Sequence, residues 1–210
     1  MFKGFSRLLG SFVAMFCAYF IPFTKIWGAL HSSFSWSSIV APVAGYHCGL
    51  LSIFSIVFFK SFLISPKLLL SMLFKRLPLL ISSWAFSFPS WINSFFIPFV
   101  CMILFVIHPV GSVVFYYSFY WFIPMILYFM PASVYSRSLS ATFVAHAIGS
   151  IVWLYFKNIE VETWQLLMPI VIIERILMAS GMIALDFIIV GVKEFSKNSI
   201  LSCNPFRKSA

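Results

Sequence analysis

Residues 171–186 read VIIERILMASGMIALD, and they place a glutamate, an arginine and an aspartate inside an otherwise apolar stretch. The rest of the sequence avoids charge, since 62% of the 210 residues are hydrophobic and only 9% are charged. A soluble domain carries roughly 25% charged residues. A chain this apolar requires lipid as its solvent, so the composition predicts an integral membrane protein and excludes a disordered one.

Six stretches are long and apolar enough to be membrane-spanning helices, because a span needs about 20 mostly apolar residues. The least regular, 84–107, belongs to a charge-free region that starts at residue 77 and contains three prolines. One kinked helix after an interfacial segment and a re-entrant hairpin both fit this region. We expect an all-α bundle over 1–192 and a short basic tail over 193–210. The predicted spans are 8–29, 38–59, 84–107, 110–130, 138–156 and 166–190.

Positive charge predicts the orientation of the bundle, because cytoplasmic loops carry an excess of Lys and Arg. With six spans and a cytoplasmic N-terminus, 11 of the 14 Lys and Arg residues lie inside, while Lys25 and Lys157 lie outside and Arg175 is intramembrane. Splitting 77–107 into two spans leaves seven inside and six outside. We therefore expect a multi-pass protein of the cell (cytoplasmic) membrane with both termini in the cytoplasm. The net charge of +9 follows from these helix-end residues and does not indicate nucleic acid.

The connection 60–76, KSFLISPKLLLSMLFKR, is basic at both ends and apolar between them. We interpret it as an amphipathic helix on the cytoplasmic leaflet, attracted by anionic lipid, with an ordinary loop as the alternative. Membrane lipid is thus one expected partner.

Small residues recur at four-residue spacing in three predicted helices, which places them on one helix face. Such stripes let helices pack closely in lipid. Packing within the bundle explains them, and for the first helix contact with a partner subunit is the alternative. The stripes are Gly10, Ala14 and Ala18; Ala41, Gly45 and Gly49; and Ala141, Ala145 and Gly149.

Polar groups of three predicted helices fall at one depth. Counting from the outer helix ends places His47, His146, Glu174 and Arg175 about 12–15 Å below the outer surface, at about 1.5 Å per residue. Charge at such depth costs about 2.5–3.5 kcal/mol on insertion scales, which makes these residues functional candidates. A ligand site and a structural ion-pair network both fit them. Since adjacent helical residues point about 100° apart, we expect Glu174 and Arg175 to face different neighbours rather than each other.

Asp186 lies three turns below Arg175 near the cytoplasmic side, and we expect it to pair with Arg137 or Lys193.

The tryptophans beside the outer loops are typical of an interfacial belt, and they also suit a lid over an outward-open pocket. In the second case Trp36, Trp153 and Trp164 join the ligand site.

Known catalytic and metal-binding patterns are missing from the sequence. It contains no HExxH, no GxSxG and no nucleotide-binding loop, and its four cysteines are scattered. We therefore expect no enzyme, no catalytic residue, no metal and no cofactor. A transporter that contains this chain must obtain ATP hydrolysis from other subunits.

The overall pattern resembles the substrate-binding S components of energy-coupling factor (ECF) transporters. The resemblance rests on about 200 residues with six spans and cytoplasmic termini, on AMFCA (14–18) in the first helix and on IVAPVAGYHCGLLSIF (39–54) in the second. It implies that Ala14 and Ala18 contact an energising transmembrane subunit, that separate ATPases supply energy, and that a vitamin or similar micronutrient binds in the outer half. The alternative is a non-catalytic membrane assembly or scaffold protein whose polar cluster is structural.

Overall fold

The computed structural model describes residues 22–25, 33–51, 53–54, 57, 69–157 and 159–202. Nearly all of this part of the chain is helical. The exception is a short antiparallel ribbon, in which β1 (Pro22–Lys25) pairs with β2 (Ser33–Ser35). Two of the helices are long and apolar enough to cross a membrane, namely Val134–Phe156 and Val161–Phe195.

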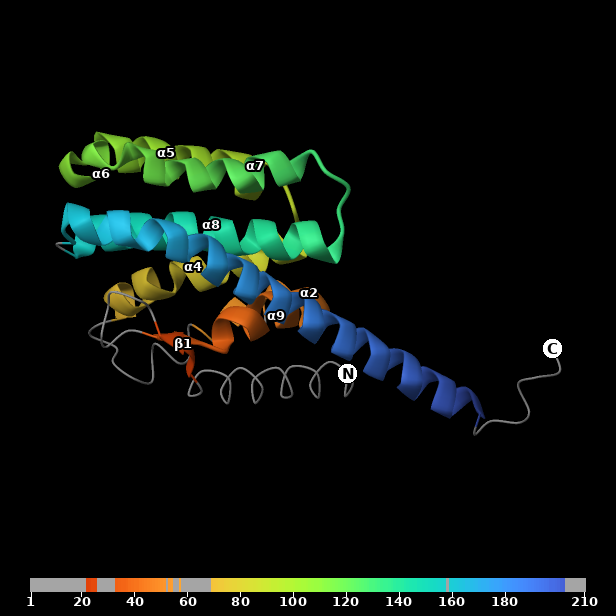
Figure 1. Cartoon of the computed structure of the whole chain (residues 1–210). Coiled ribbons are helices and arrows are strands. Elements are labelled where there is room, and N and C mark those ends of the chain that lie inside the picture. The colour runs from red at the N-terminus through yellow and green to blue at the C-terminus, as the bar shows by residue number, and fades with distance from the viewer. Residues whose placement is uncertain are drawn as a thin grey trace.

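The helices lie side by side in layers around one central helix, α8 (Figure 1). A layer of α5, α6 and α7 covers one side of α8, and α4 and α2 lie on the other side, with α9 crossing obliquely. The elements are α2 (Ser37–Cys48), α4 (Leu69–Ser87), the π-helix η2 (Ile92–Phe96), α5 (Ile97–Ile107), α6 (Pro109–Val113), the 3-10 helix η3 (Phe115–Trp121), α7 (Phe122–Tyr128), α8 (Val134–Phe156) and α9 (Val161–Ser202).

The chain reverses direction between α4 and α5. The Arg137 guanidinium at the start of α8 lies 5.4 Å from the ring centre of Phe86 at the end of α4. In contrast, the Tyr155 hydroxyl near the end of α8 donates to the Leu104 carbonyl near the end of α5, at 2.9 Å. Hence α8 is antiparallel to α4 and parallel to α5, and the prediction of one helix over 84–107 is wrong.

A turn at residues 88–90 causes this reversal, and local hydrogen bonds fix it. The Asn93 side chain accepts from the Ser90 backbone N–H at 2.9 Å, and the Ser90 hydroxyl accepts from the Asn93 N–H at 3.4 Å. This reciprocal arrangement is a capping box, which starts a new helix. The Asn93 amide also donates to the Phe88 carbonyl at 2.6 Å. Pro89 in the same turn disfavours continuation of α4.

Helix α4 also replaces the predicted amphipathic surface helix over 60–76. It begins at Leu69 and continues through Pro78 to Ser87, so residues 69–76 are its first turns, while 60–68 lie outside the described residues. The proline ring has room because it faces Gly149 of α8, where an added Cβ would lie 3.7 Å from it. Since α4 is antiparallel to α8, Arg76 lies toward the opposite end of the bundle from Arg137. The charge count placed both residues on one side.

The predicted helices 8–29 and 38–59 are interrupted. Residues 22–25 form β1 where a helix was expected, and the rest of 8–29 lies outside the described residues. Helix α2 ends at Cys48 because Gly49 has a φ of 95°, outside the helical region. The described residues between 50 and 57 are helical again, and they fold back along α2. This return is visible in one apolar cluster formed by Ala41, Ala44, Ile53, Val57 and Leu80.

Replacing Gly49 with alanine should lower the thermal stability of the purified protein. An added Cβ would meet nothing within 4 Å, so the effect isolates the cost of positive φ, which is on the order of 1–3 kcal/mol. Gly191→Ala is the matched control, since it also meets nothing within 4 Å but lies in helical backbone, where alanine is favoured. Equal melting temperatures for the two variants would contradict the role assigned to Gly49.

Candidate functional site

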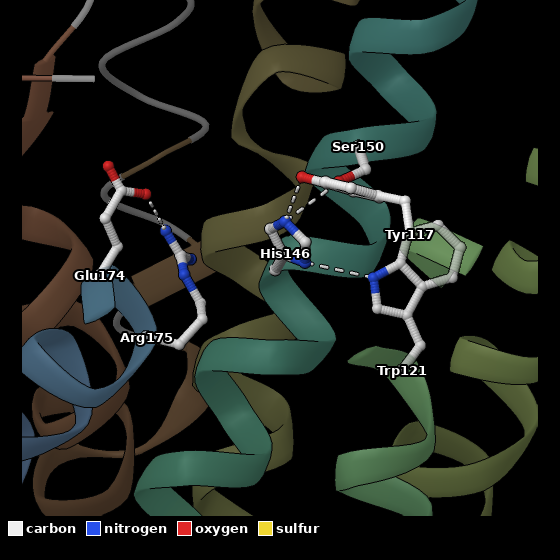
Figure 2. A network of polar contacts seen from close by, with 6 residues as sticks. All are labelled: Tyr117, Trp121, His146, Ser150, Glu174 and Arg175. Atoms are coloured by element: carbon white, nitrogen blue, oxygen red, sulfur yellow. Dashed lines mark hydrogen bonds and ion pairs between the residues drawn. The ribbon is translucent and has the colours of Figure 1, made fainter. Parts of the chain in front are cut away.

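His146 of α8 is the centre of a polar network in the bundle (Figure 2). Its Nδ1 lies 3.2 Å from the indole Nε1 of Trp121. Its Nε2 lies 2.9 Å from the Tyr117 hydroxyl and 3.4 Å from Ser150 Oγ. The ring therefore joins α8 to the aromatic helix η3 through both of its nitrogens.

These contacts determine the tautomer of His146. An indole N–H can only donate, so His146 Nδ1 must be the acceptor and carries no proton. The neutral ring then bears its hydrogen on Nε2, which donates to the Tyr117 oxygen. A ring bonded through both nitrogens acts first as a connector between helices. This agrees with a structural role for His146, and its assignment to a ligand site stays a prediction.

Glu174 and Arg175 of α9 form an ion pair beside this network (Figure 2). Arg175 Nη2 lies 3.3 Å from Glu174 Oε2, and the two side chains are 4% and 11% exposed for Arg175 and Glu174. Figure 2 shows the guanidinium on the side of α9 that faces His146. The expectation that the two residues do not pair is wrong, because both side chains are long enough to curl toward each other. The contact is nevertheless long for a charge-assisted bond, whose usual length is about 2.7–2.9 Å.

The Glu174 carboxylate retains an unused acceptor. Its Oε1 atom is buried and makes no hydrogen bond within the part of the chain that the structure describes. A buried polar atom of this kind costs about 1–3 kcal/mol unless a partner is supplied. The pair therefore combines a buried cation with a carboxylate oxygen that can accept a hydrogen bond.

His47 does not join this cluster, contrary to the prediction from depth. Its Nε2 lies 2.7 Å from Asp186 Oδ1. The prediction assumed that the second helix starts at the outer end of the bundle. Instead, Ile39 in the first turn of α2 packs against Gly181, which is about 9 Å further along α9 than Arg175 at 1.5 Å per residue. His47 consequently lies level with Asp186.

Asp186 pairs with His47, so the prediction that it pairs with Arg137 or Lys193 is wrong. Lys193 belongs to the same group, but it reaches Asp186 through His47, since Lys193 Nζ lies 2.7 Å from His47 Nδ1. Arg137 forms a cation–π contact instead, with its guanidinium 4.3 Å from the ring centre of Tyr46. Asp186, His47 and Lys193 thus form a second polar cluster, separate from that around His146.

The tryptophans proposed as a lid occupy different environments. Trp164 is buried at 2% exposure and packs edge-on against Phe105 and Tyr117 in the core, so it cannot cover an outer mouth. Trp153 is half-buried beside the same core, and Trp36 is exposed. Trp164 is therefore a core residue, whereas the ligand role of the other two stays a prediction.

Residues of two of the predicted small-residue stripes are buried inside the bundle, and the third stripe lies outside the described residues. Ala41 and Gly45 pack inside the bundle, where a Cβ on Gly45 would lie 3.4 Å from Ser83 and from Ser87 of α4. Ala141 is likewise buried. The proposed partner-contact residues Gly10, Ala14 and Ala18 lie outside the described residues.

Sequence reasoning missed Tyr117 and Trp121, which hold His146. Both are almost fully buried, at 2% and 0% exposure. They come from FYYSFYW (115–121), where aromatic residues are so dense that periodicity does not separate inward from outward positions. The 3-10 geometry of η3 sets their orientation, and no local signal predicted it.

Comparison of the chain with protein-family models, with curated proteins and with solved structures finds no match. Within the described residues, no group of three or more His, Cys, Asp or Glu side chains could hold a metal ion.

Proposed function

We propose that the chain is the solute-binding membrane subunit of an uptake transporter, in the manner of an ECF S component, and that other subunits energise it. It would cross the membrane several times as a non-catalytic helical bundle with both termini in the cytoplasm. The solute is a small vitamin-like or micronutrient-like molecule. Composition supports the membrane location, and the polar residues of α8 and α9 support a binding role.

One observation carries the binding proposal: Arg175 is buried at 3% exposure beside a carboxylate that retains an unused acceptor. An ionic group in an apolar bundle is costly and is retained where it has a task. A solute with a hydrogen-bond donor would satisfy Glu174 Oε1, and a negative group on the same solute would lie beside the buried Arg175 cation. His146, fixed by Tyr117 and Trp121, would form the opposite wall of the site.

The alternative is a membrane assembly or scaffold protein in which the same residues only hold the helices in register. The contacts of His146 favour this second function, since both ring nitrogens are bonded within the chain. The two proposals differ at Arg175. A structural cation is needed for folding, whereas a ligand-binding cation is needed for binding.

Gentle purification followed by mass spectrometry of co-purifying subunits and small molecules tests the transport proposal. We expect ATPase subunits, a transmembrane partner and a bound metabolite.

Arg175→Leu should then weaken equilibrium binding of that metabolite by about 10- to 100-fold, the equivalent of one charged hydrogen bond, while the bundle stays folded.

Arg137→Leu is the matched control, because it removes an arginine that lies nine residues before His146 on α8, and it should leave binding unchanged. A protein that purifies without partner or metabolite would contradict the transport proposal. An Arg175→Leu variant that fails to fold, with Arg175→Lys restoring the fold, would favour the scaffold.

A further inference from the structure

The cluster of Asp186, His47 and Lys193 lies apart from the proposed solute site, and its geometry points to a different ligand. Asp186 and Lys193 are seven residues apart on α9, which is two turns, so they lie on one helix face. The His47 imidazole spans this distance, with Nε2 2.7 Å from Asp186 Oδ1 and Nδ1 2.7 Å from Lys193 Nζ. One ring therefore ties the end of α2 to α9.

The two partners define the proton on the His47 ring. An ammonium group has hydrogens and no lone pair, so Lys193 must donate and Nδ1 must be unprotonated. The ring hydrogen is then on Nε2 and is donated to the Asp186 carboxylate. The carboxylate, neutral imidazole and ammonium together carry no net charge.

The only unprotonated nitrogen of the His47 ring is Nδ1, so an added proton must bind there. Nδ1 already accepts the hydrogen bond from Lys193. Protonated Nδ1 cannot accept a hydrogen bond, and an imidazolium repels an ammonium at 2.7 Å. Lys193 is exposed and can turn into solvent. The imidazolium would keep its contact with Asp186. We propose that His47 is a proton-binding site at which the proton and the Lys193 ammonium exclude each other.

The other groups around His47 do not change this exchange. On α2, Tyr46 contacts the His47 ring edge-on at 5.0 Å between centres, and Cys48 follows it in sequence. On α8, the Arg137 guanidinium stacks on Tyr46 rather than on His47. From α4, the uncharged Phe86 ring contacts Tyr46. The exposed Glu194 follows Lys193 on α9. Among the described residues, only Asp186 and Lys193 hydrogen-bond to the ring.

The consequence of protonation is local release of α9. His47 lies two residues before Gly49, where α2 ends and the chain folds back. The part of α9 that follows Lys193 extends beyond the other helices (Figure 1). Loss of the Lys193 contact would detach this part of α9 from the turn at Gly49, while the Asp186 contact two turns earlier persists. Acidification would therefore loosen one end of the α2–α9 junction. This inference does not depend on solute binding.

The test is an NMR titration of histidine-labelled protein in lipid nanodiscs between pH 5 and 8.5, the range in which imidazole groups change charge. His47→Asn assigns the signals. At high pH we expect the Nε2–H tautomer of His47. Lys193→Met should raise the titration midpoint by about one pH unit, because it removes a cation that opposes the proton. Asp186→Asn should lower the midpoint.

Lys197→Met is the matched control, since it removes the same charge four residues further along α9, and it should shift the midpoint by less than one third as much. Equal shifts for the two lysine variants would mean that any positive charge on this part of α9 has the same effect as the direct Lys193 contact. This result would overturn the proposal. So would a His47 ring that does not titrate in this range, or one that carries its hydrogen on Nδ1 at high pH.

Discussion

Gly111→Ala is expected to prevent normal folding of the bundle. An added Cβ on Gly111 would overlap the carbonyl oxygen of Phe105 and would lie 2.9 Å from its carbonyl carbon. Neither atom can move away, because Phe105 is fully buried, with its ring between Trp121 and Trp164. Overpacking of a core costs about 1–3 kcal/mol, and a clash with backbone belongs at or above the upper end. Fluorescence-detected size exclusion and thermal unfolding in detergent would measure the loss.

Gly149→Ala provides the control for this experiment. Its Cβ would lie 3.7 Å from Pro78, which is an ordinary contact, so the variant should purify and melt like the parent protein. If Gly111→Ala behaves like Gly149→Ala, then α6 does not pack against the end of α5 as closely as the structure indicates.

Trp121→Ala should destabilise the bundle by about 3–5 kcal/mol, the range for removal of a fully buried large aromatic side chain. The Trp121 ring is 0% exposed, packs edge-on against Phe105 at 5.4 Å between ring centres, and donates to His146. Its removal leaves a cavity beside α8 and an unpaired His146 Nδ1. Denaturation with SDS or heat, followed by far-UV circular dichroism, would report the change.

Two further tryptophan variants separate packing from hydrogen bonding. Trp121→Phe keeps most of the ring and removes the donor, so it should cost about 1–3 kcal/mol. Trp91→Ala should cost little, because Trp91 is 53% exposed and, among the residues that the structure describes, stacks on the neighbouring Phe95 and Phe96. A Trp121→Phe variant as unstable as Trp121→Ala would mean that the hydrogen bond, rather than packing, holds η3 against α8.

Helix could be predicted in most of the long apolar stretches, although 22–25 form β1, and the helix ends could not always be predicted. The spans expected over 138–156 and 166–190 correspond to α8 and α9, because no proline or turn signal ends those stretches early. The region from 77 to 107 contained a signal in FPSWIN (88–93), with a proline followed by a Ser-x-x-Asn capping box. Proline is frequent in membrane helices, so from the sequence alone this region fits a kinked span as well as a re-entrant hairpin.

The sequence predicted which polar residues are buried better than it predicted which of them contact one another. Burial of charge in an apolar chain identified Glu174, Arg175 and Asp186 without any structure. The depth count failed for His47 because it assumed that each helix begins at a membrane surface, whereas α2 begins halfway along α9. Which polar residues meet depends on where short helices start, and that is decided by tertiary packing rather than by hydropathy.

The length of α9 has a consequence for the membrane that would surround it. From Val161 to Lys193 the helix extends about 48 Å at 1.5 Å per residue, and the 23 residues of α8 extend about 35 Å. A bilayer with its headgroups is about 40–45 Å thick. To keep Val161 and Lys193 among the headgroups, this part of the helix must tilt by roughly 25°, which agrees with the oblique course of α9 across α8 (Figure 1). The protein would then suffer less hydrophobic mismatch in thick bilayers than in thin ones, and bilayer thickness itself would influence how steeply α9 crosses its neighbours.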